Sequence, residues 1–266
     1  MSTPIPVVVR GATGRMGQAI LRVLAERDDL TLAAALVRAG SAHAGQPVHP
    51  LADGGHRYVE RLAPDDDARV LIDFSVAGAF DDGLALALER KLAFISGTTG
   101  LDEHQRATLE RAATSIPVLW SANFSLGVAV LARLVREAAG ALPEWDCEII
   151  EAHHVAKRDA PSGTALALGR AVADARGQDF DAVAVPARTG ETAAHKPGEI
   201  GFAAVRAGDI VGEHTVLLAT AGERIELAHR ATDRAIFARG AVAAARWIAG
   251  RAPGRYALDE VVAGSG

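Results

Sequence analysis

Short apolar runs alternate with amphipathic stretches through the first half of the chain. The apolar runs predict strands at residues 7–9, 32–37, 70–74, 92–96 and 118–120. The stretches that follow most of these runs predict helices at 18–27, 77–90, 102–114 and 126–139. Strands and helices alternating at this spacing are typical of a parallel sheet covered on both faces. The first half therefore predicts an α/β fold with a doubly wound parallel sheet.

The pattern changes after about residue 140, where strand-like segments follow one another without helices between them. A strand at 148–151 and a helix at 164–175 come first, and residues 177–181 are expected to form a loop. Further strands are predicted at 183–185, 200–206, 215–219 and 224–228, before the helix at 234–249. This order favours a sheet with one covered face, the α+β arrangement of a second domain.

Composition places the chain among globular proteins, with 49% apolar and 23% charged residues. The net charge of −5 argues against a nucleic-acid partner, which would need a broad basic surface. Lys91, Lys157 and Lys196 are the only lysines among 28 basic residues, so chemistry that needs an ammonium group has three places to occur. Cys147 is the single cysteine, which excludes an internal disulfide and a cysteine-based metal cluster.

The sequence shows no targeting or membrane-spanning pattern. Its first residues lack the basic start, apolar run and cleavage site of a signal peptide. The longest uncharged stretch, residues 112–132, is interrupted by Pro117, Asn123 and Gly127, so it predicts strand, loop and helix in place of a membrane span. We therefore expect a soluble, cytoplasmic protein with no membrane partner, a setting with which the lone cysteine is compatible.

A glycine-rich loop joins the first predicted strand to the first predicted helix, with glycines at Gly11, Gly14 and Gly17. Glycine at these positions permits a tight turn, close approach of the backbone to a pyrophosphate, and close packing of helix on strand. The helix amino terminus then offers N–H groups and a positive dipole to the phosphates. An ordinary turn is the alternative, which the place of the loop after the first strand disfavours.

The end of the second predicted strand bears on the choice of cofactor. Sites that prefer NAD usually carry Asp or Glu there to bind the ribose hydroxyls, and this chain has Val37 in the corresponding position. Arg38 follows and suits a 2′-phosphate, so we expect NADPH to be preferred, with NADH as a second cofactor still open. The alternative is that Arg38 is a solvated surface arginine.

Three further loops follow predicted strands, at residues 73–75, 97–100 and 121–124. The carboxyl ends of parallel strands meet at one edge of a sheet, so these loops are expected to share a crevice with the glycine-rich loop. Their small hydroxyl residues suit bonds to nicotinamide or ribose oxygens. Taken one by one they are also compatible with plain turns, but as a set they favour a cofactor site.

Residues 151–164 concentrate the residue types that carry acid–base chemistry, including His153, His154 and Lys157. Adjacent histidines on an extended strand point to opposite sides, so they do not form a ready metal pair, and we expect no metal site. Ser162 and Thr164 flank Gly163 at a predicted helix amino terminus, which is a site for an anion such as a substrate carboxylate. A capped helix beside solvated basic residues is the alternative.

A nicotinamide site combined with such a cluster indicates hydride transfer. The cofactor would carry the hydride, while the protein supplies orientation and protons. Histidine exchanges protons near neutral pH, and an ammonium group donates one or stabilises developing negative charge. The sequence thus favours an oxidoreductase that acts on a small acidic substrate.

Five segments together resemble the 4-hydroxy-tetrahydrodipicolinate reductases, also called dihydrodipicolinate reductases, over about residues 5–262. The segments are GATGRMG, SGTTG, ANFSLGV, EIIEAHHVAKRDAPSGTALALG and GFAAVRAGDIVGEHTV. The resemblance implies a nicotinamide-dependent reduction that gives tetrahydrodipicolinate in the diaminopimelate route to lysine. It also implies a small dicarboxylate substrate and a homotetramer.

The resemblance assigns roles to particular residues. It implies His153 as proton donor and acceptor, Lys157 as proton donor, and His154 as a substrate contact, with a substrate carboxylate on Gly163 and Thr164 beside Ser162. The implied cofactor contacts are Gly11, Ala12, Thr13, Gly14, Arg15, Met16, Arg38, Gly97, Thr98, Thr99, Ser121, Ala122, Asn123 and Phe124. Val37 departs from the family, many of whose members have an acidic residue there, and this puts NADH use in doubt.

The resemblance also implies how the chain divides into domains. Residues 1–124 and 235–266 would form a Rossmann-type dinucleotide-binding domain, and 125–234 an inserted α+β substrate-binding and oligomerisation domain. The crossovers near Phe124 and Asp233 would be hinges that allow closure over the ligands.

Two rival functions are weaker. A semialdehyde dehydrogenase needs a nucleophilic cysteine, yet Cys147 lies in a strand-like stretch, residues 145–148, without a helix amino terminus to activate it. A non-enzymatic NADP sensor would keep the glycine-rich loop but would have no use for histidines and a lysine beside an anion site.

Overall fold

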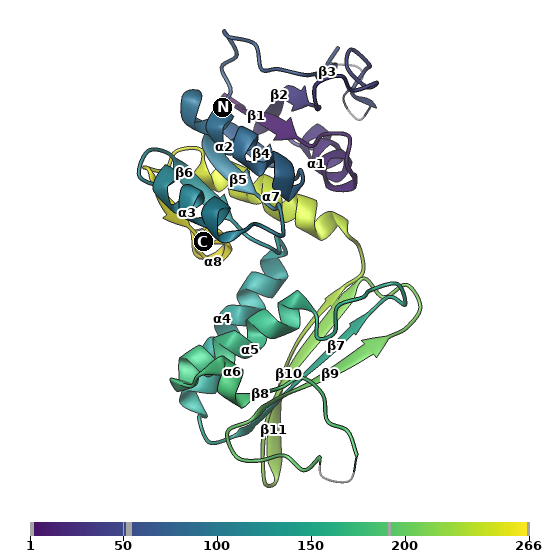
Figure 1. Cartoon of the computed structure of the whole chain (residues 1–266), viewed down its shortest axis with the longest axis vertical. Coiled ribbons are helices and arrows are strands. Elements are labelled where there is room, and N and C mark those ends of the chain that lie inside the picture. Colours follow the sequence, from purple (N-terminus) through teal and green to yellow (C-terminus); the bar gives the residue numbers. More distant parts are fainter. Residues whose placement is uncertain (1–2, 50, 52–54, 191–192, 265–266) are drawn as a thin grey trace. The chain divides into compact units, whose positions relative to one another are not determined.

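The computed structural model describes residues 3–49, 51, 55–190 and 193–264, and these divide into two compact units (Figure 1). The first unit is formed by the described residues up to Leu126 together with those from Ala235 onward, and the second is Gly127–Arg234. The outer ends of the expected first domain, residues 1–2 and 265–266, lie outside the described residues.

The first unit is built on a seven-stranded sheet in the order β12-β6-β5-β4-β1-β2-β3, with every neighbouring pair parallel. The strands are β1 (Ile5–Arg10), β2 (Leu30–Leu36), β3 (Tyr58–Val59), β4 (Val70–Asp73), β5 (Ala93–Ser96), β6 (Pro117–Trp120) and β12 (Gly254–Tyr256). The order reverses between β1 and β4, and open sheets of this kind bind ligands beyond the strand ends at that point.

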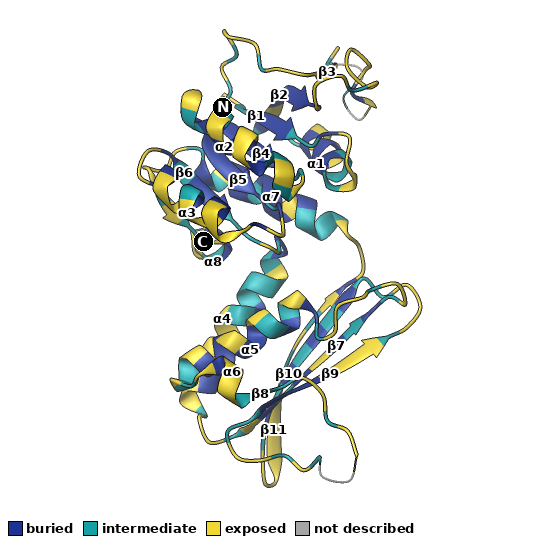
Figure 2. Ribbon diagram, viewed as in Figure 1, coloured by how far each residue is buried: buried dark blue, intermediate teal, exposed yellow. Residues whose placement is uncertain are grey.

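Helices cover both faces of this sheet, as the buried strands and half-exposed helices of Figure 2 show. Helices α1 and α7 contact each other on one face, and α2 contacts α3 on the other, where Val8, Leu71 and Phe94 join a core with Leu84 and Leu109. The helices of this unit are α1 (Arg15–Ala25), the short 3-10 helix η2 (Ala77–Ala79), α2 (Phe80–Glu89), α3 (Glu103–Ala112), α7 (Ala235–Ile248) and α8 (Leu258–Ala263). The predicted doubly wound, Rossmann-type fold is confirmed.

Three short elements of the first unit do not follow from the sequence pattern. Strands β3 and β12 are two and three residues long, too short to show a period, and each exists because it pairs with a longer neighbour, β2 or β6. Helix α8 is six residues long, and the N–H of Ala257, the residue before it, donates a hydrogen bond to the Glu260 side chain.

The second unit contains a mixed five-stranded sheet in the order β11-β10-β7-β9-β8. Strands β7, β9 and β8 are parallel, whereas β10 runs antiparallel to both β7 and β11. The strands are β7 (Asp146–His153), β8 (Ala184–Val185), β9 (Ile200–Arg206), β10 (Gly212–Thr220) and β11 (Glu223–Ala231). This mixed sheet confirms the α+β fold predicted for the second half of the chain.

Helices α4 (Leu126–Ala141) and α5 (Gly163–Arg176) supply the core of the second unit against one face of its sheet. Cys147 and Ile149 of β7 face this core, while the next residue, Ile150, is exposed on the other face. One expectation needs correction, because the four-residue helix α6 (Phe180–Val183) begins where a loop was predicted. The Phe180 ring packs edge-on against Phe202 of β9, a long-range contact that local sequence does not reveal.

Candidate active site

The glycine-rich loop between β1 and α1 has no room for side chains at two positions. Gly11 has a φ of +72°, and a Cβ added there would lie 2.7 Å from the carbonyl oxygen of Phe74. A Cβ on Gly17 would lie 2.2 Å from the carbonyl oxygen of Gly11, so helix and loop are in close contact. Gly14 is the residue before α1 and has no side chain to cap the helix. It therefore does not compete with a ligand for the N–H groups at the helix amino terminus. This is the geometry that a dinucleotide pyrophosphate requires.

Two cavities border this loop and the end of β2. One of about 540 Å³ is lined by Gly11, Thr13 and Gly14 of the loop, and one of about 770 Å³ is lined by the end of β2 and by both arginine and acidic side chains. Arg38 lines both cavities, as Val37 does, so the predicted arginine lies where the loop and the β2 end converge. The residues present therefore fit a nicotinamide dinucleotide and its phosphates.

The remaining predicted residues of the loop differ in exposure. Ala12 is fully buried and its N–H bonds to Leu36 of β2, so its side chain faces the core. Arg15 and Met16 form the first turn of α1 and are exposed or half-buried. Arg10, which sequence reasoning missed, lines both cavities and its guanidinium lies 3.1 Å from Asp73 Oδ1. Its signal was a charged residue at the carboxyl end of an otherwise apolar strand.

The loop after β5 is organised by the buried carboxylate of Asp73. Thr98 Oγ1 donates to Asp73 Oδ2 at 2.9 Å, so the predicted Thr98 hydroxyl faces inward. Trp120 Nε1 donates to the Thr98 carbonyl at 2.9 Å and fixes the loop from β6. Gly97 lies against the Phe74 ring, which a Cβ there would approach to 2.1 Å, and Thr99 follows as an exposed residue.

The loop after β6 is also held by internal contacts. Ser121 Oγ donates to the carbonyl oxygen of Asn123 at 2.6 Å, and Ala122 between them is exposed. The Phe124 ring packs on Phe74 with ring centres 5.2 Å apart, so the loops after β4, β5 and β6 share one aromatic contact. The structure thus brings the predicted cofactor residues of the first unit to one edge of its sheet.

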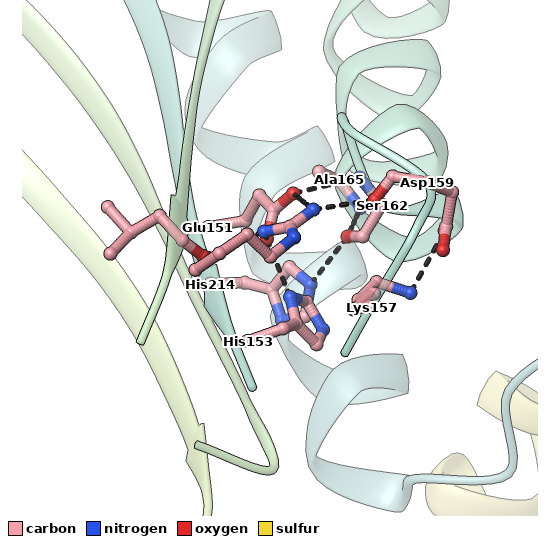
Figure 3. Close-up of polar contacts among 9 residues, drawn as sticks. Glu151, His153, Lys157, Asp159, Ser162, Ala165 and His214 are labelled. Carbon is pink, nitrogen blue, oxygen red and sulfur yellow. Dashed lines mark hydrogen bonds and ion pairs between the residues drawn. The ribbon is translucent and has the colours of Figure 1, made fainter. Parts of the chain in front are cut away.

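The candidate chemical site of the second unit lies where β7 ends and α5 begins (Figure 3). His153 is the last residue of β7, and its Nδ1 lies 2.6 Å from Glu151 Oε2. Burial lowers the pKa of His153, although the carboxylate of Glu151 acts in the opposite direction. Burial also tends to raise the pKa of Glu151, but hydrogen bonds from Arg206 and His153 outweigh it, so the pKa is lowered. Glu151 is therefore an ionised carboxylate beside a histidine that favours its neutral form.

Lys157 lies on the loop between β7 and α5. Its ammonium nitrogen is 2.9 Å from Asp159 Oδ2, and this hydrogen bond lowers the pKa of Asp159. The Lys157 N–H bonds to the carbonyl oxygen of His154, whose side chain is half-buried. The predicted lysine is thus a charged group with an acidic partner two residues away.

Ser162 caps α5, as the sequence predicts for a helix start. Its Oγ accepts a bond from the Ala165 N–H and lies 3.0 Å from His214 Nε2, while its own N–H donates to Glu151. The polar groups of Ser162 are therefore used inside the unit. Gly163 and Thr164 form the exposed and half-exposed first turn of the helix, where an anion is favoured.

Three residues of this cluster received no role from the sequence: Glu151, Arg206 and His214. His214 comes from β10 and lies edge-on to His153, with ring centres 5.2 Å apart. Burial lowers the pKa of His214 to about 4, so this ring is neutral near neutral pH. Alternation along β7 places Glu151 and His153 on one face of the strand, so the sequence could have indicated that Glu151 lies beside His153. Arg206 and His214 reach the site only through strand pairing, which local sequence does not show.

Cys147 does not support a thioester mechanism. Its side chain is fully buried in β7, and burial raises the pKa of its thiol to about 12. A nucleophilic cysteine needs a lowered pKa and access to substrate. Within the described ranges, His, Cys, Asp and Glu side chains form no group of three or more suited to a metal ion.

The Rossmann unit with its dinucleotide cradle, joined to an α+β unit with an acid–base cluster, defines a nicotinamide-dependent class of oxidoreductase. The family model described as "Dihydrodipicolinate reductase, N-terminus" matches residues 5–124, and "Dihydrodipicolinate reductase, C-terminus" matches residues 127–262. The chain belongs to the dihydrodipicolinate reductase family, which confirms the resemblance noted from its motifs.

Curated relatives match along almost their whole length. The 4-hydroxy-tetrahydrodipicolinate reductase of Xanthomonas campestris pv. campestris is 48% identical over 264 residues, which cover 98% of this chain and 99% of the relative. That of Stenotrophomonas maltophilia (strain R551-3) is 48% identical and covers 98% of each chain.

A solved structure of the same family supports the fold. A dipicolinate-bound dihydrodipicolinate reductase from Paenisporosarcina sp. TG-14 superposes with a TM-score of 0.77 at 21% identity, covering 97% of this chain and 99% of that one. An amine dehydrogenase from Mycobacterium smegmatis gives a TM-score of 0.59 at 12% identity, covering 96% and 95%. In the part of the chain that the structure describes, no helix has the length and apolar character needed to cross a membrane.

Proposed function

We propose that this protein catalyses the NAD(P)H-dependent reduction of 4-hydroxy-tetrahydrodipicolinate to tetrahydrodipicolinate, in the diaminopimelate route to lysine. Family membership over residues 5–124 and 127–262 supports this reaction. The observation that carries the proposal is the gathering of His153, Lys157 and the amino terminus of α5 in one part of the second unit.

The first unit would hold the cofactor. Its pyrophosphate would lie on the glycine-rich loop and the amino terminus of α1, with Arg38 toward the adenosine end. The loops at residues 97–99 and 121–124 would face the nicotinamide end from the same edge of the sheet. When bound, the cofactor supplies a hydride, and the protein supplies orientation and protons.

The second unit would bind a small dicarboxylate. Gly163 and Thr164 would receive one carboxylate at the amino terminus of α5, where the helix dipole favours negative charge. His154 and Lys157 would contact the substrate from the preceding loop. Ser162 would support this site by capping the helix, since its hydroxyl is bonded to Ala165 and His214.

His153 and Lys157 would manage the protons of the reaction. Lys157 holds a transferable proton on its ammonium group, and an arginine at this position would hold its proton too tightly. His153 would exchange a proton at Nε2, because its Nδ1 is bonded to Glu151.

We further propose a homotetramer assembled through the open face of the five-stranded sheet. The helices of the second unit cover one face, and Ile150 and Val205 are 38% and 45% exposed on the other. Exposed apolar side chains on a sheet face are typical of a protein interface. Sedimentation velocity tests this: a tetramer in the unchanged protein and smaller species after Val205→Glu are expected, and a monomeric unchanged protein would contradict it.

The direct test of the function is turnover. Purified protein is mixed with NADPH and freshly synthesised 4-hydroxy-tetrahydrodipicolinate, and loss of reduced nicotinamide absorbance is followed with product identified by mass spectrometry. We expect oxidation of NADPH that depends on both protein and substrate. A folded protein that binds NADPH but yields no tetrahydrodipicolinate would reject the reductase in favour of an NADP sensor.

A further inference from the structure

The carboxylate of Glu151 has hydrogen-bond partners from three parts of the second unit. It is almost fully buried on β7, with an exposed fraction of 1%. Both of its oxygens accept bonds of 2.8 Å from the guanidinium of Arg206 on β9. One oxygen also lies 2.6 Å from His153 Nδ1, and the other accepts the N–H of Ser162 at 3.1 Å. A buried carboxylate with this many partners has a fixed position and a fixed charge.

This carboxylate determines which nitrogen of His153 carries the hydrogen. An ionised carboxylate only accepts hydrogen bonds, so the short contact requires a hydrogen on Nδ1. In the neutral imidazole, Nε2 is then the unprotonated nitrogen that exchanges a proton. Gly212 lies beside this nitrogen, and a Cβ added there would lie 3.1 Å from Nε2. The Glu151 contact therefore leaves Nε2 as the nitrogen for chemistry.

Arg206 connects this pair to the loop that carries the lysine. Besides its two bonds to Glu151, its guanidinium donates to the backbone carbonyl oxygen of Asp159, the residue whose side chain pairs with Lys157. Arginine suits this task because its planar group donates several hydrogen bonds in fixed directions. A single guanidinium thus holds both the carboxylate behind His153 and the loop of Lys157.

We propose that Glu151 is the positioning residue for the proton exchange, holding His153 as the Nδ1–H tautomer with Nε2 available, and that Arg206 keeps this carboxylate ionised. The proposal rests on the proposed function in so far as His153 exchanges the proton. The charged and titratable groups that face His153 are Glu151 of its own strand, Arg206 of β9, His214 of β10 and Lys157 of the loop.

The test removes the charge of Glu151 with little change in shape, through Glu151→Gln. We expect kcat to fall at least about tenfold while the KM for NADPH stays within about twofold, because the cofactor residues lie in the other unit. The acid limb of the kcat/KM profile should move to lower pH by about one unit, since the imidazolium loses its counter-charge. A folded Glu151→Gln variant with unchanged kcat and an unchanged pH profile would overturn the proposal.

Glu148→Gln is the matched control. Glu148 lies on the same strand and pairs with an arginine, Arg188, at 2.7 Å, yet its carboxylate has no contact with His153. This variant loses the same charge from the same strand, so kcat and the pH profile should be unchanged. A profile that shifts equally in both variants would show a general charge effect and would count against a positioning role.

A nuclear magnetic resonance measurement reads the tautomer without turnover. In protein labelled with nitrogen-15 on histidine, with the His153 signals assigned by their loss in His153→Asn, the unchanged protein should show hydrogen on Nδ1 and none on Nε2 near neutral pH. The Nε2–H tautomer would overturn the proposal, even if Glu151→Gln proved unable to fold. Absence of reductase activity with the Nδ1–H tautomer present would instead reject the proposed function.

Discussion

The ammonium nitrogen of Lys157 lies 2.9 Å from Oδ2 of Asp159, two residues further along the loop that leads into α5. The Asp159 side chain is 58% exposed, so water reaches one partner of this ion pair freely. An exposed pair of this kind contributes at most about 1 kcal/mol to stability. In the proposed function, the carboxylate of an incoming substrate would therefore compete with Asp159 for Lys157 at little cost to the stability of the fold.

Lys157→Ala should lower the turnover rate without weakening the binding of the cofactor. We expect kcat to fall about 100- to 10,000-fold, the usual contribution of a positioned proton donor, while the Kd for NADPH stays unchanged. Lys157→Arg keeps the charge but holds its proton too tightly, so it should not restore turnover. Steady-state rates and fluorescence titration with NADPH check this, and loss of NADPH binding in either variant would speak against the assigned role.

Arg38→Ala should reduce discrimination between the two nicotinamide cofactors. A charge-assisted hydrogen bond to the 2′-phosphate is worth about 1.5–3 kcal/mol, so kcat/KM for NADPH should fall by about one to two orders of magnitude. Values for NADH serve as the internal control and should stay within about threefold, because NADH lacks that phosphate. Equal losses with both cofactors would mean that Arg38 does not read the 2′-phosphate.

Gly17→Ala should destabilise the first unit and remove cofactor binding. The new Cβ would lie 2.2 Å from the carbonyl oxygen of Gly11, and neither backbone segment can yield easily. Overpacking of this kind costs about 1–3 kcal/mol. Gly78→Ala is the control because its Cβ would meet nothing within 4 Å. Urea denaturation followed by circular dichroism, with NADPH titration, should separate the two variants; similar behaviour would contradict the close contact.

Acid should destabilise the protein through His214. Its pKa is about 4 in the folded state against 6.5 as the ordinary value, so the unfolded chain binds the proton more readily between these values. Stability from this group is retained above pH 6.5 and lost as the pH falls toward 4, by an amount on the order of 3 kcal/mol. Glu151, whose pKa is lowered from 4.5, adds its own loss of stability as the pH falls below 4.5.

His214→Gln should flatten this part of the stability profile. Free energies of unfolding from urea titrations at a series of pH values check it, with His104→Gln as the control because His104 is exposed on α3. Burial also lowers the pKa of His229, which is paired with His214 across β10 and β11. The His214→Gln variant should therefore still lose some stability on acidification, with a smaller slope. An unaltered slope in His214→Gln would assign the acid sensitivity to other groups.

The long elements of the fold could be predicted because each carries its own period. Helix α5, for example, has a serine cap at Ser162 and a left-handed glycine at Gly177, and both are visible in the sequence. Helix α6 could not be predicted, since it depends on the contact between Phe180 and Phe202. Local patterns predict which residues form the long elements, whereas the shortest elements form only because of pairing and packing with distant parts of the chain.

The candidate site shows the same division. The sequence could predict His153, Lys157 and Ser162 as site residues because they lie within one short stretch of the chain. Arg206 and His214 join them through the register of β9 and β10 against β7, which no local pattern specifies. The hydroxyl of Thr98 likewise turns toward Asp73, because a buried carboxylate needs donors.

The division of the first unit into two stretches has a consequence for the order of folding during synthesis. A nascent chain that has reached Arg234 contains every strand and helix of the second unit, yet the first unit still lacks α7, which packs on β4, β5 and β6, and the edge strand β12. One apolar face of the first sheet therefore remains partly uncovered until the last part of the chain is synthesised. Until then it is exposed to solvent or to chaperones. The middle of this protein is able to finish folding before its beginning does.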